Sequence, residues 1–329
     1  MMQRILPVVV AVVTTLAAPA QVCADDGSLA VQIVDALNKA YGAHPGFRAN
    51  HAKGIVAEGS FEPSREAAKV SRSPLFAGGK LPVTVRFSDA SGIPNLSDGS
   101  PAANPHGMAI KFHLPSGADT DIVTNSLKVF PVATGEEFRD LNLAIAASPP
   151  GAPKPTALDT FVASHPSVPR ALGSVSTPAS FADEVYYGID AFVFANSVGK
   201  KQPVRYVVAP ERVVHLAPEE AAKQPPDFLV DELPTRLAKG PVTFHLKAQL
   251  AAPGDPTKDP TQAWPDDRPV AELGVIAVEK VVPDSAEAQK KLLFLPTLLT
   301  DGIAPSDDPL IALRSAAYSV SFSRRTSAP

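Results

Sequence analysis

The sequence predicts an α+β fold in which an eight-stranded antiparallel β-barrel carries a helical insertion and is followed by C-terminal helices. Three observations support this prediction. The β-rich runs fall into two groups of four, a proline- and alanine-rich stretch separates the groups, and the pattern changes to helical spacing near the C-terminus. Two groups of four strands with turn residues between them suit one closed barrel better than two domains.

A secretory leader is expected at the N-terminus. A basic residue precedes an apolar run at residues 5–18, and small residues follow up to Ala24, which is the layout of a signal peptide. We therefore expect residues 1–24 to be removed, residues 25–329 to form a single domain, and the mature protein to be periplasmic or secreted. Cys23, the only cysteine, would leave with the leader, so no disulfide is expected.

Composition narrows the choice of partners. The formal net charge is −4, without a basic excess, so no nucleic-acid partner is expected. The apolar leader run is shorter than the ~20 residues that cross a bilayer, and no later stretch comes close, so no membrane span is expected. A small-molecule partner is favoured.

The first half of the chain opens with a helix and continues with strands. The helix is expected at residues 31–41, where apolar residues recur at helical spacing. The first group of strands is alternating or rich in β-formers, and it covers residues 52–61, 81–88, 107–114 and 121–125.

The second half begins with the insertion, at residues 134–182, which has helical pieces at 135–147 and 157–162. The second group of strands then covers residues 189–197, 204–209, 242–250 and 273–281. Leucine-rich helical spacing marks residues 294–325. The last helix starts within Pro305-Ser306-Asp307-Asp308-Pro309, where Ser306 or Asp307 can cap it and Pro309 fits the first turn.

Three residues of that last helix share one face. Arg314, Tyr318 and Arg325 are spaced by four and seven residues, which places them within an arc of ~40°. A neighbouring guanidinium favours the phenolate form of a tyrosine, and tyrosinate is a known axial ligand of heme iron. The alternative is an amphipathic surface helix with a half-buried tyrosine and two solvated arginines.

His51 is the histidine with the most suggestive surroundings. It lies beside Asn50 and Lys53 at the start of an expected strand, although an isolated histidine is usually an ordinary core or surface residue. The other six histidines show no metal-ligand spacing, so a zinc site is not expected. Nucleophile elbows, Walker loops and dinucleotide fingerprints are also missing from the sequence.

One expected strand combines a polar face with an apolar face. Alternation puts Arg86 and Ser88 on one side, and Val83, Val85 and Phe87 on the other. An arginine that points into a barrel mouth needs an anion, and a heme propionate would be a suitable bidentate partner. An arginine at the edge of a strand is an equally good interpretation.

In this combination the chain resembles the heme catalase family, over nearly the whole mature sequence. Its motifs follow the family's order along the chain, which makes the joint match more specific than any one motif. They are Arg48-x-x-His51-Ala52-Lys53-Gly54, Val85-Arg86-Phe87-Ser88, Asn104-Pro105-His106-Gly107-Met108-Ala109-Ile110-Lys111-Phe112, Asp121-Ile122-Val123-Thr124-Asn125, Asp259-Pro260-Thr261-Gln262-Ala263-Trp264-Pro265, Gly302-Ile303-Ala304-Pro305-Ser306 and Arg314-x-x-x-Tyr318.

The resemblance implies a site around heme b and its iron. On the distal side, it makes His51 the acid and base, Asn125 its partner and Ser88 the residue that orients His51. On the proximal side, it makes Tyr318 the iron ligand, with Arg314 beneath it. It implies propionate binding by Arg48, Arg86 and Arg325, and an aromatic contact near the heme from Phe130.

The departures from the family pattern shape the expected function. Asn50 replaces an apolar residue, Lys128 and Pro131 interrupt the pattern after Asn125, and the chain ends soon after Arg325. The sequence is therefore most similar to the short, exported catalase-related peroxidases. That resemblance implies reduction of hydrogen peroxide or organic peroxides through a ferryl intermediate, with an unidentified electron donor, weak catalase activity, and a monomer or small homo-oligomer.

Two alternatives remain open. The first is a periplasmic heme carrier without selected turnover, which the His51 and Asn125 pair argues against because carriage needs no acid and base. The second is a relative that rearranges lipid hydroperoxides on the same scaffold.

Overall fold

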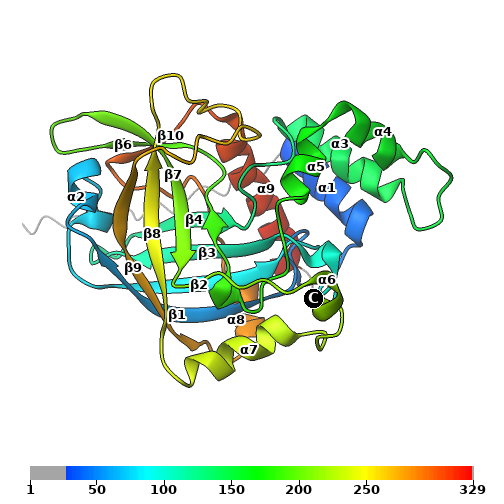
Figure 1. Ribbon diagram of the computed structural model, residues 1–329, viewed down its shortest axis with the longest axis horizontal. Coiled ribbons are helices and arrows are strands. Elements are labelled where there is room, and N and C mark those ends of the chain that lie inside the picture. The colour runs from blue at the N-terminus through cyan, green and yellow to red at the C-terminus, as the bar shows by residue number, and fades with distance from the viewer. Residues whose placement is uncertain (1–26, 328–329) are drawn as a thin grey trace, which may run out of the picture.

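A closed antiparallel β-barrel forms the centre of the computed structural model, which describes residues 27–327. The expected leader, including Cys23, lies outside the described residues. Each barrel strand pairs with its neighbours, and pairing of β7 with β8 closes the ring (Figure 1). The strands of the ring are β1 (Gly54–Pro63), β2 (Leu81–Asp89), β3 (His106–His113), β4 (Asp119–Asn125), β5 (Tyr186–Tyr187), β7 (Lys201–Pro210), β8 (Val242–Leu250) and β9 (Val270–Val281). The expected eight-stranded antiparallel barrel is confirmed.

Aromatic and aliphatic side chains fill the inside of the barrel. The inward face of β2 carries Val83, Val85 and Phe87, all of which are buried. Phe87 stacks on Phe181 at a centroid distance of 5.5 Å, and Phe244 lies 6.0 Å away. Burial of each such side chain contributes ~1.5–3 kcal/mol. The interior is thus a packed core, and any ligand must bind elsewhere.

The strand expected at residues 189–197 is shorter than predicted and does not belong to the ring. The strand that completes the ring is β5, which lies before that range, while β6 (Phe192–Ala195) pairs with the other end of β7. A short strand missed from the sequence, β10 (Ile303–Pro305), extends the sheet beyond β6. Both differences arise because strands this short have too few residues to show alternation.

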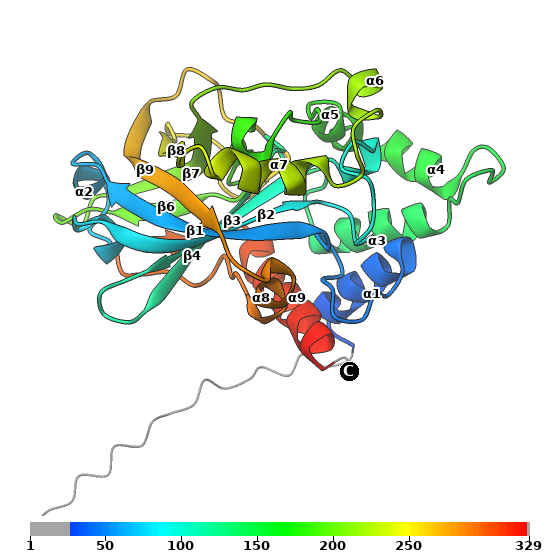
Figure 2. The same ribbon diagram turned by 90° about the horizontal axis from the view of Figure 1, so that it is seen from below.

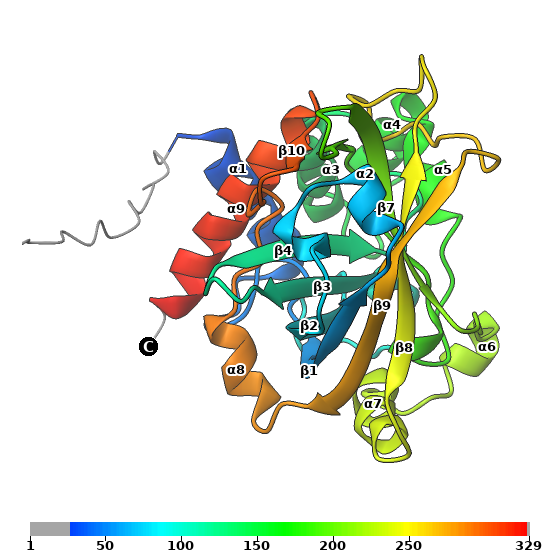
Figure 3. The same ribbon diagram turned by 90° about the vertical axis from the view of Figure 1, so that its left-hand side faces the viewer.

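Three helices frame the outer face of β2, β3 and β4. They are α1 (Leu29–Tyr41), α3 (Gly135–Ala146) and α9 (Pro309–Thr326). Apolar residues of α1 and α9 form one buried cluster, to which Phe138 of α3 adds its ring. Figures 2 and 3 show α1 and α9 side by side along this flank of the barrel.

Local sequence explains where these helices begin. The Thr134 side chain accepts from the backbone of Glu137, whose carboxylate returns to Thr134, which is a capping box at the start of α3. The cap of α9 is Asp308, whose carboxylate accepts from the Leu310 N–H at 2.8 Å. The expectation of Ser306 or Asp307 was wrong by one or two residues, although Pro309 does occupy the first turn.

The remaining helices are short. Those in the insertion are α4 (Ala157–Ser164) and α5 (Ser167–Leu172), and the others are α2 (Ala67–Val70), α6 (Pro218–Ala221), α7 (Phe228–Leu237) and α8 (Ser285–Lys291), with 3-10 turns at Pro74–Phe76, Pro101–Ala103 and Phe181–Asp183. None of the helices within residues 27–327 is long and apolar enough to cross a membrane.

Candidate active site

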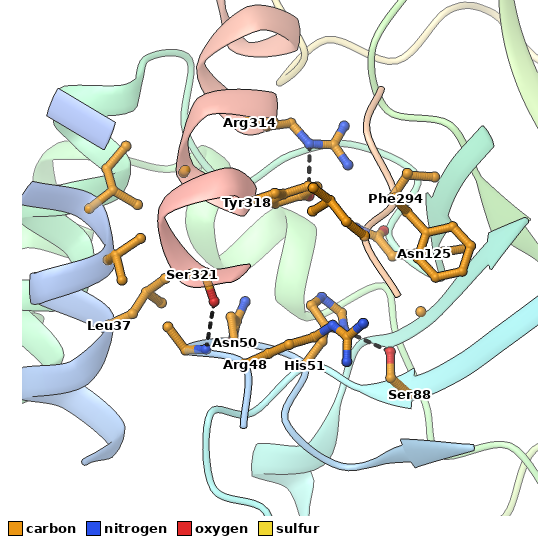
Figure 4. Close-up of a pocket in the computed structure, with 18 of the residues that line it drawn as sticks. Leu37, Arg48, Asn50, His51, Ser88, Asn125, Phe294, Arg314, Tyr318 and Ser321 are labelled. Carbon is orange, nitrogen blue, oxygen red and sulfur yellow. Dashed lines mark hydrogen bonds between the residues drawn. The ribbon is translucent and has the colours of Figure 1, made fainter. Parts of the chain in front are cut away.

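A cavity lies between the outer face of β2, β3 and β4 and the helices α1 and α9. It encloses about 1250 Å³ of empty space, including its opening to solvent. The structure brings all the sequence-predicted site residues together in its wall, and Figure 4 labels Arg48, His51, Ser88, Asn125, Arg314 and Tyr318 among them. They are Arg48, His51, Arg86, Ser88, Asn125, Phe130, Arg314, Tyr318 and Arg325.

His51 is held by its backbone as well as by its ring. Its φ angle is 55°, in the left-handed region, which costs a non-glycine residue ~1–3 kcal/mol and is typical of functional sites. Its N–H donates to the Ala90 carbonyl at 3.1 Å, and its own carbonyl accepts from the Arg86 guanidinium at 2.8 Å. Ring atom Nδ1 lies 3.1 Å from Oγ of Ser88, so the imidazole is fixed in orientation.

The environment of His51 keeps its ring neutral. Burial, followed by the positive charges of Arg86, Arg314 and Arg48 and by His106, lowers the pKa of His51 to about 3. When Nδ1 carries the hydrogen and donates to Ser88, Nε2 is left with a lone pair that faces the cavity. The residue can therefore accept a proton from a bound molecule and return it.

Gly107 supports this arrangement from the neighbouring strand, and sequence reasoning did not single it out. A Cβ atom at this position would lie 2.9 Å from Oγ of Ser88 and 3.1 Å from Nδ1 of His51. Because Gly107 pairs with Ser88 across the β2–β3 ladder, only a residue without a side chain leaves the His51–Ser88 hydrogen bond undisturbed.

Asn125 closes β4 opposite Gly107. Its Oδ1 atom accepts from the Leu127 N–H at 2.8 Å, which defines the orientation of the amide. The Nδ2 group is consequently left to donate a hydrogen bond into the cavity.

Arg48, Arg86 and Arg325 gather at one end of the cavity. Arg86 leaves the outer face of the barrel, so the expectation that it points into the barrel mouth was wrong, because Val85 and Phe87 occupy the interior. These arginines donate to uncharged acceptors only: Arg86 binds the Gln289 side chain at 2.9 Å, and Arg48 binds the Leu292 carbonyl at 2.8 Å.

Charge in this arginine cluster is uncompensated. Burial, then repulsion by Arg325, lowers the pKa of Arg86 to about 9, and burial lowers the pKa of Arg325 to about 10. Burial and both neighbours lower the pKa of Arg48 well below its usual value. No carboxylate among residues 27–327 forms an ion pair with any of the three. Buried cations without partners are costly, so the cluster is built for an anionic ligand.

Tyr318 lies on the opposite wall, on α9. Its hydroxyl accepts a hydrogen bond from Nε of Arg314 at 3.1 Å, and Arg314 forms an ion pair with the buried Asp190. Burial alone would lower the pKa of Arg314, but Asp190 and Tyr318 outweigh it, so the pKa is raised. The phenol oxygen of Tyr318 therefore has a fixed cationic hydrogen-bond donor beside it.

Apolar side chains line much of the remaining wall. Phe130 contacts the ring of Phe138 at 5.2 Å between centroids. The other apolar lining residues include Ile33, Val34, Leu37, Leu292, Phe294 and Leu313. The polar Asn50 also faces the cavity (Figure 4).

Fold and cavity together define a class of protein, a closed antiparallel barrel with a large pocket between its outer face and two helices. The family model described as Catalase matches residues 32–328. The chain therefore belongs to the catalase family.

The similar proteins reported next fall into two groups, catalase-related peroxidases and catalases. The chain is 37% identical to a catalase-related peroxidase of Mycolicibacterium paratuberculosis, over 90% of this chain and 94% of that protein. It is 35% identical to a catalase-related peroxidase of Synechococcus elongatus, over 90% and 88%. A catalase of Vibrio vulnificus is 30% identical, over 82% of this chain and 56% of its own.

Solved catalase structures share the fold. A fungal catalase superposes with a TM-score of 0.74 at 23% identity, and covers 85% of this chain. Catalase A of Saccharomyces cerevisiae gives 0.72 at 22% identity, again over 85% of this chain. The chain spans 59% and 61% of those two longer proteins.

Catalases generally use heme, and the donor set of this cavity fits that group. A phenol oxygen with a guanidinium partner suits a ferric ion. Arg48, Arg86 and Arg325 match the carboxylates at one edge of the ring, and the apolar walls match its faces. The unpaired charge of the arginine cluster is the strongest part of this fit, because no residue between 27 and 327 forms an ion pair with it.

Proposed function

We propose that this protein is an exported heme b-dependent peroxidase, which reduces hydrogen peroxide or organic peroxides with electrons from a separate donor. Weak catalase activity and a monomeric or small homo-oligomeric state belong to the same proposal. Export rests on the leader-like pattern of residues 1–24.

Tyr318 would bind the iron through its phenolate, with Arg314 holding that oxygen. Arg48, Arg86 and Arg325 would bind the propionates. A bound heme would supply the electrons that break the O–O bond of the peroxide, and the donor would replace them. The reaction balances as one peroxide, two electrons and two protons giving one alcohol or water molecule plus one water molecule.

The side chains facing the distal space move the protons and orient the peroxide. The neutral His51 accepts the proton of the peroxide on Nε2, and returns it to the oxygen that leaves. Ser88 keeps the ring in place during both transfers, since it holds Nδ1 at 3.1 Å. Asn125 donates from Nδ2 to the bound peroxide and so fixes its position.

The observation that carries the proposal is the way in which the backbone and the neighbouring residues hold the His51 ring. A strained left-handed backbone, a serine at Nδ1 and a glycine beside it hold one neutral imidazole against the cavity. A heme carrier needs no such base. Preference for peroxidase over catalase turnover is supported by similarity to two catalase-related peroxidases along most of their length.

The test compares two reactions in one heme-loaded preparation of the purified protein. Oxidation of an electron donor with added hydrogen peroxide should exceed oxygen evolution from hydrogen peroxide alone. His51→Gln should keep the heme spectrum and lose ~10²–10⁴-fold in donor oxidation, the usual effect of removing a general acid and base. Oxygen evolution without donor oxidation would overturn the peroxidase assignment, and heme binding without either reaction would favour a carrier.

A further inference from the structure

A second polar cluster lies buried directly behind the distal residues. Asp89 follows Ser88 at the end of β2, and His106 precedes Gly107 at the start of β3, so the two face each other in the ladder. Their exposed fractions are 1% and 0%. Nε2 of His106 lies 3.4 Å from Oδ1 of Asp89, so an acid and an imidazole are adjacent inside the protein.

Several atoms of this cluster have no hydrogen-bond partner among the described side chains and backbone. They are both carboxylate oxygens of Asp89, both ring nitrogens of His106, and one oxygen of Asn104. Buried polar atoms are seldom left unpaired, and groups of them usually hold ordered water. A set of such atoms in contact is a path along which protons can move.

One end of the cluster reaches the surface. The carboxyl group of Asp98 contacts that of Asp89, and Lys53 forms ion pairs with both Asp98 and Asp227. The Lys53–Asp227 distance is 2.6 Å, and the Asp227 side chain is 58% exposed. A continuous row of titratable groups therefore runs from solvent to Asp89.

The other end lies behind the cavity wall, on the barrel side of the β2–β3 ladder, where His106 packs against Phe181. Gly107, the residue after His106, lies so close to His51 that a Cβ there would sit 3.1 Å from its ring. His106 is also one of the groups whose charge acts on His51. Gly107 and Ser88, the next pair of the ladder, face His51 on the cavity side, so the row of groups ends one residue pair away from the distal base.

We propose that Asp227, Lys53, Asp98, Asp89 and His106 form a route that delivers solvent protons to the distal side of the cavity during peroxide reduction. This inference rests on the proposed peroxidase function. The canonical distal residues exchange one proton within the substrate, and they do not explain where the additional protons of the balanced reaction originate.

Stoichiometry shows when such a route is needed. Reduction by a donor that supplies electrons alone takes up two protons for each peroxide. A phenolic donor brings a proton with each electron, and conversion of two hydrogen peroxide molecules to oxygen and water takes up none. Only the first reaction depends on delivery from solvent.

The protonation states suit this role. Burial, followed by Asp98, raises the pKa of Asp89 to about 8, against the opposing effects of Lys53 and Arg86. At neutral pH, Asp89 therefore holds a proton that it can donate. Burial, followed by His215, lowers the pKa of His106 to about 3, so its neutral ring can accept at one nitrogen and donate from the other.

Other charged groups also face this pair. Tyr186 on β5 lies near Asp89, and His215 is paired with Glu184 at 3.2 Å.

The experiment uses the full heme-loaded protein with two donors, ferrocyanide for electrons alone and guaiacol for electrons with protons. Asp89→Asn and His106→Gln should slow peroxide reduction by ferrocyanide by at least about tenfold, less than loss of a direct general acid because water provides a slower path. Guaiacol oxidation and the heme spectrum should change by less than about twofold. Asp255→Asn, a change at a carboxylate paired with Arg268 far along the chain, is the matched control.

A second measurement does not depend on turnover. Infrared titration of the heme-loaded protein should show a protonated carboxyl band that disappears near pH 8, and Asp89→Asn should lack it. Equal slowing with both donors would assign the cluster a structural role only, and unchanged ferrocyanide turnover would refute the route. Failure of the wild-type protein with every donor would instead overturn the peroxidase function.

Discussion

Replacing Gly107 by alanine tests whether the cavity is built around a precisely placed histidine. The added methyl group would lie 2.9 Å from Oγ of Ser88 and 3.1 Å from Nδ1 and Cε1 of His51. Ordinary contact begins at 3.4 Å, so the two side chains must move by up to about half an ångström. Their hydrogen bond, 3.1 Å long, would be stretched beyond useful length, at a cost of ~0.5–1.5 kcal/mol.

The loss of function should be much larger than the loss of stability. Alanine is favoured over glycine within a strand by ~0.5–1 kcal/mol, which offsets the lost hydrogen bond, so the free energy of unfolding should change by less than ~1 kcal/mol. A misplacement of about 1 Å can cost ~10²-fold in rate, and half that distance should cost about tenfold. Denaturant titration and donor oxidation measure the two effects.

A double-mutant cycle isolates the mechanism. If Gly107→Ala acts by separating His51 from Ser88, then combining it with Ser88→Ala should cost little beyond Ser88→Ala alone. Additive losses of activity, or full activity in Gly107→Ala, would show that the close approach of these three residues does not control the reaction.

Two substitutions in the cavity and one pH titration test further parts of the protein. Tyr318→Phe should abolish the ferric heme spectrum characteristic of a phenolate ligand, while leaving Arg314 paired with Asp190; an unaltered spectrum would reject Tyr318 as the ligand. Arg48→Gln should stabilise the heme-free protein by ~1 kcal/mol, because it relieves repulsion from Arg86 and Arg325, and it should weaken heme binding. The control Arg324→Gln, on the exposed face of α9, should have neither effect. An equal change in the stability of the heme-free and heme-bound protein would contradict an anion site. The contribution of His106 to stability should fall by roughly 1 kcal/mol per pH unit as the pH drops from about 6.5 to 3, because the folded state keeps its ring neutral while the unfolded chain binds a proton. It is measured as the difference in slope between the wild-type protein and His106→Gln, and equal slopes would refute it.

The parts of the site that sequence could predict depend on local periodicity. Arg314, Tyr318 and Arg325 share a face because helical spacing alone places them there, and the alternation of β2 puts Arg86 with Ser88. The family resemblance added Asn125 and the catalytic role of His51, which have no periodic signal of their own.

Tertiary contacts decided the rest. Asp190 reaches Arg314 from a loop distant in sequence, and Gln289 binds Arg86 from α8, a helix too short to predict. The left-handed conformation of His51 follows from its bonds to Ala90 and Arg86. The helix α7 was missed because Pro234 lies inside it, although proline usually ends a helical pattern.

The position of α9 at the far end of the chain bears on how the protein matures. Tyr318 and Arg325 belong to the last helix, while His51 and Arg48 belong to a segment before the first strand, and Ser321 joins the two by accepting from the Ala49 N–H at 3.2 Å (Figure 4). The residues that would bind a prosthetic group are therefore not all present in a growing polypeptide until synthesis has passed Arg325. Loading must therefore come after translation of the whole barrel.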